Sequence, residues 1–225
     1  ISGYLITSII LKELFATGSF SFKYFYKRRI RRILPVLLLV MLASLPIAYK
    51  YIQPYEINEY SKSILYSLGF SSNFYFHNSG LDYAVEGLKH PFLHTWSLSV
   101  EEQYYVLFPI ILFFTFKYFR KYIIYILVLG FIVSLGFADW SSRNHPSISF
   151  YFIHTRMWEL LAGSILAYFE IKLGRRSNIK TLNFIFPFVG IALISHSILF
   201  FDDEMLHPSI YTLSPILGVS LIIWF

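Results

Sequence analysis

The sequence predicts an all-α protein, a polytopic bundle of transmembrane helices. Of its 225 residues, 56% are hydrophobic and 14% are charged, whereas a soluble domain carries roughly 25% charged residues. The mean hydropathy is +0.57, and apolar runs long enough to cross a bilayer recur along the chain. Short basic segments separate these runs, as the positive-inside rule expects of cytoplasmic loops. They account for the net charge of +6 without nucleic acid as a partner.

We expect the chain to be one integral-membrane domain over 1–225, excerpted from a longer protein and truncated at both ends. It opens inside one apolar run, at 1–11, and stops inside another, at 222–225. The first run is then the end of a span whose beginning precedes it. The absence of cysteine excludes disulfides and thiolate chemistry within the sequence given.

The first half of the chain is expected to contain two further crossings. Residues 35–51 form a span that runs outward from the basic loop 23–35. Residues 62–76 are rich in serine, and a full crossing needs about 20 apolar residues, so this segment is expected to be re-entrant or half-buried. Residues 98–116 cross next, with their far end in the cytoplasm because bases follow it. These bases are Lys117, Arg120 and Lys121.

The second half is expected to continue the alternation. Residues 123–140 return outward, 148–169 run inward, 182–201 run outward, and 211–225 begin an inward span. Basic residues mark one set of loops and acidic residues the other, as sidedness in a membrane requires. The basic loop contains Lys172, Arg175, Arg176 and Lys180, and the acidic loop contains Asp202, Asp203 and Glu204.

The stretch 94–105 carries dense polar chemistry directly before an apolar run. Ser99 and Glu102 have the spacing of a helix-start box, which by itself would explain Glu102. Glu101 is not explained in this way, because it shares one helical face with Ser97, Tyr104 and Phe108. Ionisable groups at membrane depth are costly and usually functional. The candidate catalytic residues are Glu101 and Glu102, and the candidate cavity residues nearby are His94, Trp96, Ser97, Gln103 and Tyr104.

Two further charged groups are candidates for the site. Six bases fall within 23–32, and they are either a topological anchor or a site for an anionic, phosphate-bearing donor such as a coenzyme. Arg156 and Glu159 are three residues apart inside an apolar segment and can pair on one helical face. The pair is either a structural bridge between helices or a contact for substrate, and the spacing alone does not distinguish the two. The candidate donor-binding residues are Arg28, Arg29 and Arg32.

No metal site is expected. Among the seven histidines, His90 and His94 alone have the spacing of a helical zinc pair, and Pro91 between them is incompatible with the helix.

Four sequence blocks, taken together, resemble the membrane-bound acyltransferase family 3, the O-acyltransferases that modify bacterial surface polysaccharides. Residues 2–7 are similar to the family's Ser-Gly-aromatic-Leu-Ile-Thr block, and 26–35 to its arginine-rich loop before a proline. Residues 94–104 closely resemble its His-Thr-Trp-Ser-Leu-Ser-Val-Glu-Glu-Gln signature. Residues 155–163 resemble its Thr-Arg-x-Trp-Glu-Leu helix.

The resemblance implies transfer of an acyl group, usually acetyl, from cytosolic acyl-CoA to a sugar hydroxyl on the far side of the bacterial inner membrane. Acyl-CoA would be a co-substrate, and no bound cofactor is implied. The acceptor could be O-antigen, capsule or peptidoglycan. The family's catalytic histidine belongs to an Arg…His motif on the first span, which we expect upstream of residue 1, so it is assigned to none of the seven histidines here.

Within this reading, Arg28, Arg29 and Arg32 would hold the donor's phosphates. Glu101, with Trp96, Ser97 and Gln103, would line the acceptor side or orient the upstream histidine. Arg156 and Glu159 would form the inner wall of the same cavity. Two alternatives remain open. A transporter or flippase of a surface glycan would bury the same charges around a polar path. A structural subunit would need these charges only as bridges.

Overall fold

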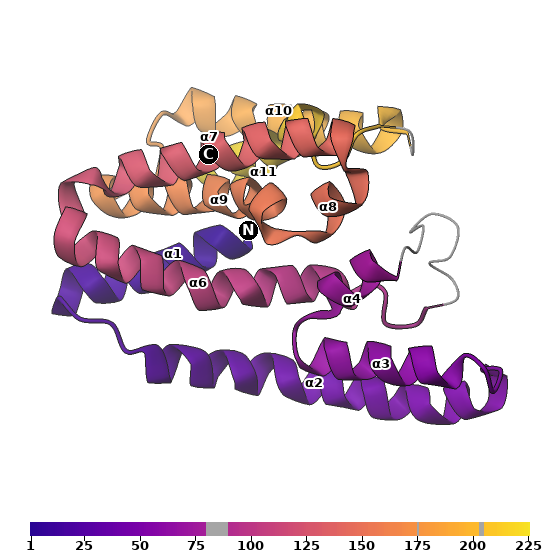
Figure 1. The fold of residues 1–225 in the computed structure, drawn as a ribbon. Coiled ribbons are helices and arrows are strands. Elements are labelled where there is room, and N and C mark those ends of the chain that lie inside the picture. Colours follow the sequence, from indigo (N-terminus) through magenta and orange to yellow (C-terminus); the bar gives the residue numbers. More distant parts are fainter. Residues whose placement is uncertain (80–89, 175, 203–204) are drawn as a thin grey trace. The chain divides into compact units, whose positions relative to one another are not determined.

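The computed structural model describes residues 1–79, 90–174, 176–202 and 205–225, and these residues form helices joined by turns and short loops (Figure 1). Arg175, Asp203 and Glu204 of the two predicted charged loops lie outside the described residues. The helices are α1 (Ser2–Thr17), α2 (Phe22–Tyr51), α3 (Ile57–Leu68), α4 (Ser72–Asn78), α6 (Thr95–Phe119), α7 (Ile123–Asn144), α8 (Pro146–Tyr151), α9 (Ile153–Leu173), α10 (Lys180–Phe200) and α11 (Leu213–Trp224).

The predicted fold class is confirmed. In the described part of the chain, three stretches are long and apolar enough to cross a membrane by length and composition. They are α2, the stretch Thr95–Asn144 that contains α6 and α7, and α10.

Three predicted segments differ from the observed helices. The basic segment 23–35, expected as a loop, lies inside α2, which begins at Phe22. The segment 62–76 is divided between α3 and α4 by a turn in which Phe70 has φ 49°. The predicted span 148–169 is interrupted at Phe152, whose extended backbone ends α8 before α9 begins.

The described residues divide into two compact units. One contains Ile1–Ser19 and Tyr104–Phe225, and the other contains Phe20–Gln103. The helix α6 contributes its first turns to the second unit and the rest to the first.

In the first unit, α9 packs against both α1 and α7. Glycines allow α1 and α9 to approach closely, because a Cβ at Gly163 would lie 2.7 Å from the Tyr4 backbone nitrogen. Between the same two helices, the Thr7 hydroxyl donates to Ser164 Oγ at 2.8 Å. The pair α10 and α11 meets in a similar way, at Gly190 and Gly218.

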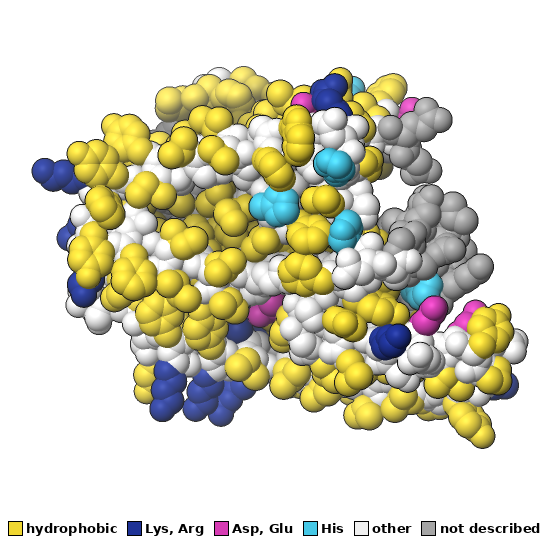
Figure 2. Space-filling view, viewed as in Figure 1, with side chains coloured by type: hydrophobic (Ala, Val, Ile, Leu, Met, Phe, Trp, Pro, Cys, Tyr) yellow, Lys and Arg dark blue, Asp and Glu magenta, His cyan; other side chains and the backbone are white. Residues whose placement is uncertain are grey.

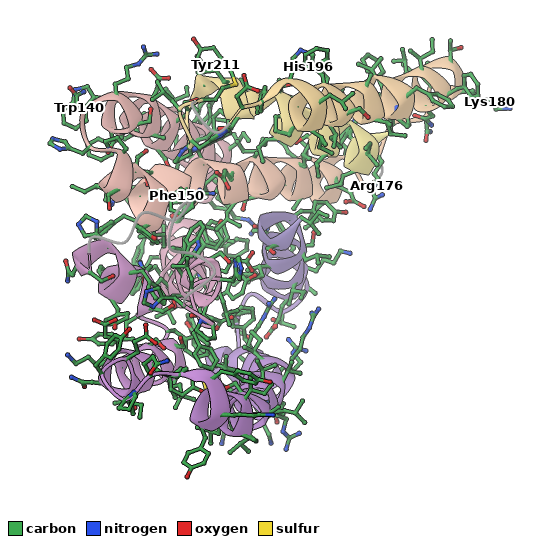
Figure 3. The ribbon with its side chains drawn as sticks, turned by 90° about the vertical axis from the view of Figure 1, so that its right-hand side faces the viewer. Trp140, Phe150, Arg176, Lys180, His196 and Tyr211 are labelled. Carbon is green, nitrogen blue, oxygen red and sulfur yellow. The ribbon has the colours of Figure 1, made fainter. Side chains whose placement is uncertain are left out.

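The turns of the first unit lie at two opposite ends. Figure 3 shows Arg176 and Lys180 at the end where α9 is followed by α10, and Trp140 and Phe150 at the other end. Between α6 and α7, the Arg120 guanidinium carbon lies 4.9 Å from the ring centroid of Phe15 and 4.6 Å from that of Phe116.

In the second unit, α2 and α3 run antiparallel and side by side (Figure 1). The buried side chains of Leu37, Met41, Tyr60 and Phe92 form their shared core, and Leu98 at the start of α6 packs against it. The hydroxyls of Ser44 and Tyr60 lie 2.8 Å apart and add a polar link between the two helices.

Candidate functional site

The signature helix α6 begins at Thr95, one turn before the predicted helix-start box. Ser99 is therefore an interior helix residue, and the interpretation of Ser99 and Glu102 as a helix-start box is wrong. The Ser99 hydroxyl donates to the Thr95 carbonyl at 3.1 Å and accepts from the Ser72 backbone N–H at 3.2 Å. Because Ser72 begins α4, Ser99 attaches the start of α6 to α4.

A buried chain of hydroxyls extends this attachment to α3. Ser67 and Thr95 lie 2.7 Å apart, Thr95 donates to Ser72 at 3.0 Å, and the Ser72 and Ser99 hydroxyls lie 2.8 Å apart. The three serines are at most 1% exposed. Hydrogen bonds between helices in an apolar environment hold helices in a defined orientation. This network therefore fixes how the first turns of α6 face α3 and α4.

Gln103 belongs to the same attachment. Its Nε2 donates to the Phe70 carbonyl at 3.1 Å and to Asn73 Oδ1 at 2.9 Å. Asn73 is fully buried. The amide nitrogen of Gln103 thus binds the turn before α4 and α4 itself, rather than facing an open acceptor space.

The two glutamates lie between these anchored positions, and both are half-buried. Glu102 Oε1 is buried and has no hydrogen-bond partner among the described residues. A buried acceptor without a partner is uncommon in proteins and requires an explanation, such as a bound water or a ligand. Arg29 is close enough for its positive charge to act on the Glu102 carboxylate.

The other signature residues face different surroundings. Trp96 is 7% exposed, whereas His94 and Ser97 are exposed and linked by a bond from the Ser97 hydroxyl to the His94 carbonyl at 3.1 Å. Tyr104, in the first unit, is buried, stacks on Phe108 and lies 2.9 Å from Ser164 Oγ through its hydroxyl. The predicted shared face of α6 is therefore exposed at Ser97 and buried from Tyr104 onward.

The basic segment forms the first turns of α2, and Figure 2 shows lysine and arginine side chains gathered over this part of the helix. Arg28 and Arg32 are exposed one turn apart, and Arg31 is also exposed. Arg29 is half-buried, and its guanidinium carbon lies 5.5 Å from the ring centroid of the buried Phe25. The structure thus leaves Arg28 and Arg32 exposed and half-buries Arg29.

The predicted pairing of Arg156 with Glu159 is confirmed, within the first unit, by a distance of 3.5 Å between Arg156 Nη1 and Glu159 Oε1. Arg156 Nε also donates to the Phe150 carbonyl at 3.1 Å. In the loop after α10, burial lowers the pKa of His207, and the positive charge of Arg156 lowers it further. Arg156 thus interacts with groups that come from α8, α9 and this loop.

The sequence did not predict which residues contact the candidate site residues. These are Ser72 for Ser99, Asn73 for Gln103, Ser164 for Tyr104 and His207 for Arg156. The helical spacing of Ser63 and Ser67 was the available signal for the hydroxyl network, because serines one turn apart form a polar stripe on an otherwise apolar helix. A second polar cluster, formed by Tyr4, Glu170 and Arg176, was also not predicted. In it, Arg176 Nη2 donates to the Tyr4 hydroxyl at 2.8 Å and Arg176 Nε donates to Glu170 at 3.2 Å.

Comparison with known proteins identifies the family. The acyltransferase domain model of acyltransferase family 3 matches residues 1–225. An uncharacterized protein of Haemophilus influenzae is 33% identical over 231 residues, which cover 99% of this chain and 94% of that protein. The O-acetyltransferase OatA of Staphylococcus aureus is 29% identical over 175 residues, which cover 75% of this chain and 28% of OatA. No solved structure gives a significant match. The chain therefore belongs to the acyltransferase 3 family of membrane proteins.

Proposed function

We propose that this protein is an O-acyltransferase of the bacterial inner membrane. It transfers an acyl group, which we propose to be acetyl, from cytosolic acyl-CoA to a hydroxyl of an extracytoplasmic carbohydrate. Family membership and the similarity to OatA support an acyl donor and a hydroxyl acceptor. The observation that carries the proposal is the signature helix, where Glu102 Oε1 is buried without a protein partner among the described residues and beside a basic helix.

The reaction needs a few kinds of group. The oxygen of the acceptor hydroxyl forms a bond to the thioester carbonyl carbon, the carbon–sulfur bond breaks, and the proton of the hydroxyl passes to a base while CoA leaves as the thiol. A base lowers the barrier to attack, and positive charges or oriented dipoles stabilise the developing oxyanion.

The described residues supply candidates for these tasks. Arg28 and Arg32 are exposed on the basic turns of α2 and suit the donor's phosphates, because guanidinium groups form paired hydrogen bonds with phosphate. Glu101 and Glu102 supply carboxylates to accept or orient the transferred proton. In the first unit, Arg156 and Glu159 provide a charged group for contact with the acceptor.

The proposal is tested with the full-length protein in membranes given radiolabelled acetyl-CoA and a crude surface-polysaccharide acceptor. Alkali-labile label on the acceptor is expected with the wild-type protein, together with losses of roughly 100-fold or more in Glu101→Gln and Glu102→Gln. Glu59→Gln is the matched control, since Glu59 is exposed on α3, and it should transfer at the wild-type rate.

Two results would contradict the proposal. Full transfer in both glutamate variants would remove these carboxylates from the site. No label with any of several acyl donors and acceptors, together with movement of a glycan across the membrane, would favour a flippase.

A further inference from the structure

Arg29 differs from the other arginines of the basic helix. The side chains of Arg28, Arg31 and Arg32 are exposed, as befits groups that bind a phosphate or a lipid surface, whereas Arg29 is half-buried. Its guanidinium lies over Phe25, which is 2% exposed and also contacts the rings of Phe20 and Tyr26. An aromatic face is a favourable surface for a guanidinium that is partly removed from water. The aromatic cluster thus supports Arg29 in an inward position.

Measured along the helix axes, Arg29 and Glu102 lie toward the same end of their unit, beyond its hydrophobic cluster. Leu37 of α2 and Leu98 of α6 pack in one cluster, and α2 runs opposite to the first turns of α6 (Figure 1). With a rise of about 1.5 Å per residue, Glu102 lies about 6 Å beyond Leu98, and Arg29 lies about 12 Å before Leu37. Both displacements are in the same direction because the helices are antiparallel.

The described residues around Glu102 fix its backbone but give its carboxylate oxygen Oε1 no hydrogen bond. On one side, Gln103 is held by Phe70 and Asn73, and one turn earlier Ser99 is held by Ser72. The backbone that carries Glu102 is therefore fixed, while its Oε1 atom has no partner among the described residues. An acceptor oxygen without a protein partner, carried on a fixed backbone, suits a hydrogen bond from a substrate, because only the side chain itself has to be ordered on binding.

We propose, on the basis of the acyl-transfer function proposed above, that Arg29 is a positioning residue for Glu102 and not a ligand of the donor's phosphates. Its charge holds the carboxylate within the second unit, and Glu102 Oε1 accepts a hydrogen bond from the reacting acceptor hydroxyl. The basic helix thereby has two roles, one at its exposed arginines and another at Arg29.

The test compares Arg29→Gln, Arg29→Lys, Arg32→Gln, Glu102→Gln and the double variant Arg29→Gln/Glu102→Gln in the full-length protein. Steady-state rates give kcat and the KM for acetyl-CoA, and calorimetry gives the affinity for CoA itself. Lys50→Gln is the matched control, because it removes one charge from an exposed position in the last turn of the same helix, outside the basic segment. Only variants that elute like the wild-type protein in size-exclusion chromatography are compared.

We expect Arg32→Gln to raise KM and weaken CoA binding, with kcat retained. Arg29→Gln should lower kcat about tenfold and Glu102→Gln roughly 100-fold, both with CoA affinity unchanged. The double variant should be no slower than Glu102→Gln, since Arg29 acts through Glu102. Arg29→Lys should recover part of the lost kcat because it keeps the positive charge.

Weakened CoA binding in Arg29→Gln, like that in Arg32→Gln, would overturn the positioning role and make Arg29 a donor ligand. A double variant whose losses multiply would overturn it as well. Both results require an active wild-type protein, so they differ from failure of the proposed function, in which the wild-type protein itself transfers no acyl group.

Discussion

The ion pair of Arg156 and Glu159 has two candidate roles, a structural bridge within the first unit and a contact with the acceptor. The side chains are 21% and 26% exposed, and Arg156 also binds the Phe150 carbonyl and lies over its ring. We expect an arginine with these contacts to remain in place when its carboxylate partner is removed, with its charge no longer compensated. A single substitution therefore measures the cost of leaving one charge uncompensated, whereas the double substitution measures the net contribution of the pair to stability.

We predict that Glu159→Gln lowers the free energy of unfolding by about 1–3 kcal/mol, toward the lower end because solvent screens a partly exposed pair. The double variant Arg156→Met/Glu159→Met removes both charges and should unfold close to the wild-type temperature. If the pair contacts the acceptor, the double variant folds but fails to transfer label. The measurements are thermal unfolding in detergent and the transfer assay.

Arg143→Met serves as the control, because Arg143 is 53% exposed in its pair with Asp139 and should have little effect on unfolding. A double variant that is both stable and fully active would make the Arg156–Glu159 pair a purely structural bridge.

Among individual residues, the sequence predicted the pairing at Arg156 and Glu159 because the spacing of three on one helix determines it locally. It failed at Ser99 and Glu102, where a local pattern matched a helix start. The helix starts at Thr95, after a turn in which the Leu93 and Thr95 backbone N–H groups donate to His90 and Phe92. Ser99 is instead bound to Ser72, a partner distant in sequence that no local pattern contains.

At the scale of elements, the apolar runs predicted the long helices well, because burial in lipid requires continuous helix. The basic segment was assigned to a loop on the basis of its charge, although lysine and arginine are good helix formers and simply extend α2. The spacing of Arg28, Arg29 and Arg32 did not indicate their different exposure, since the half-buried position of Arg29 depends on the aromatic ring of Phe25 beside it.

Close contact between α1 and α9 depends on glycine. A Cβ at Gly163 would lie 2.7 Å from the backbone nitrogen of Tyr4, which cannot move without shifting α1. We predict that Gly163→Ala destabilises the protein by about 1–3 kcal/mol, the usual cost of overpacking a tight contact. Thermal unfolding in detergent measures the loss.

Gly136→Ala is the matched control, because Gly136 lies in α7 and a Cβ added there would have no described atom within 4 Å beyond its own stretch of helix. This variant should therefore be tolerated. Equal unfolding temperatures for the two variants would show that α1 and α9 do not rely on this contact.

At the scale of the whole molecule, sidedness in the membrane follows from the turns of the first unit. Lys117, Arg120 and Lys121 lie around the turn from α6 to α7, and Lys172, Arg176 and Lys180 lie around the turn from α9 to α10. The turn after α7 and the loop after α10 lie at the other end (Figure 3). The positive-inside rule assigns the basic end to the cytoplasm.

This orientation can be tested directly because the chain contains no cysteine. The 22 residues of α7 extend about 33 Å, enough to cross a hydrocarbon core of about 30 Å. We predict that a membrane-impermeant maleimide labels Asn144→Cys on intact cells, whereas Lys121→Cys reacts only after permeabilisation; both side chains are exposed at the ends of this crossing. The parent protein without an introduced cysteine controls for background. The opposite pattern would invert the orientation, and labelling of both positions from outside would show that α7 does not cross. An outward-facing Asn144 would place the Phe150 and Arg156 end of the first unit on the side of the carbohydrate acceptor proposed above.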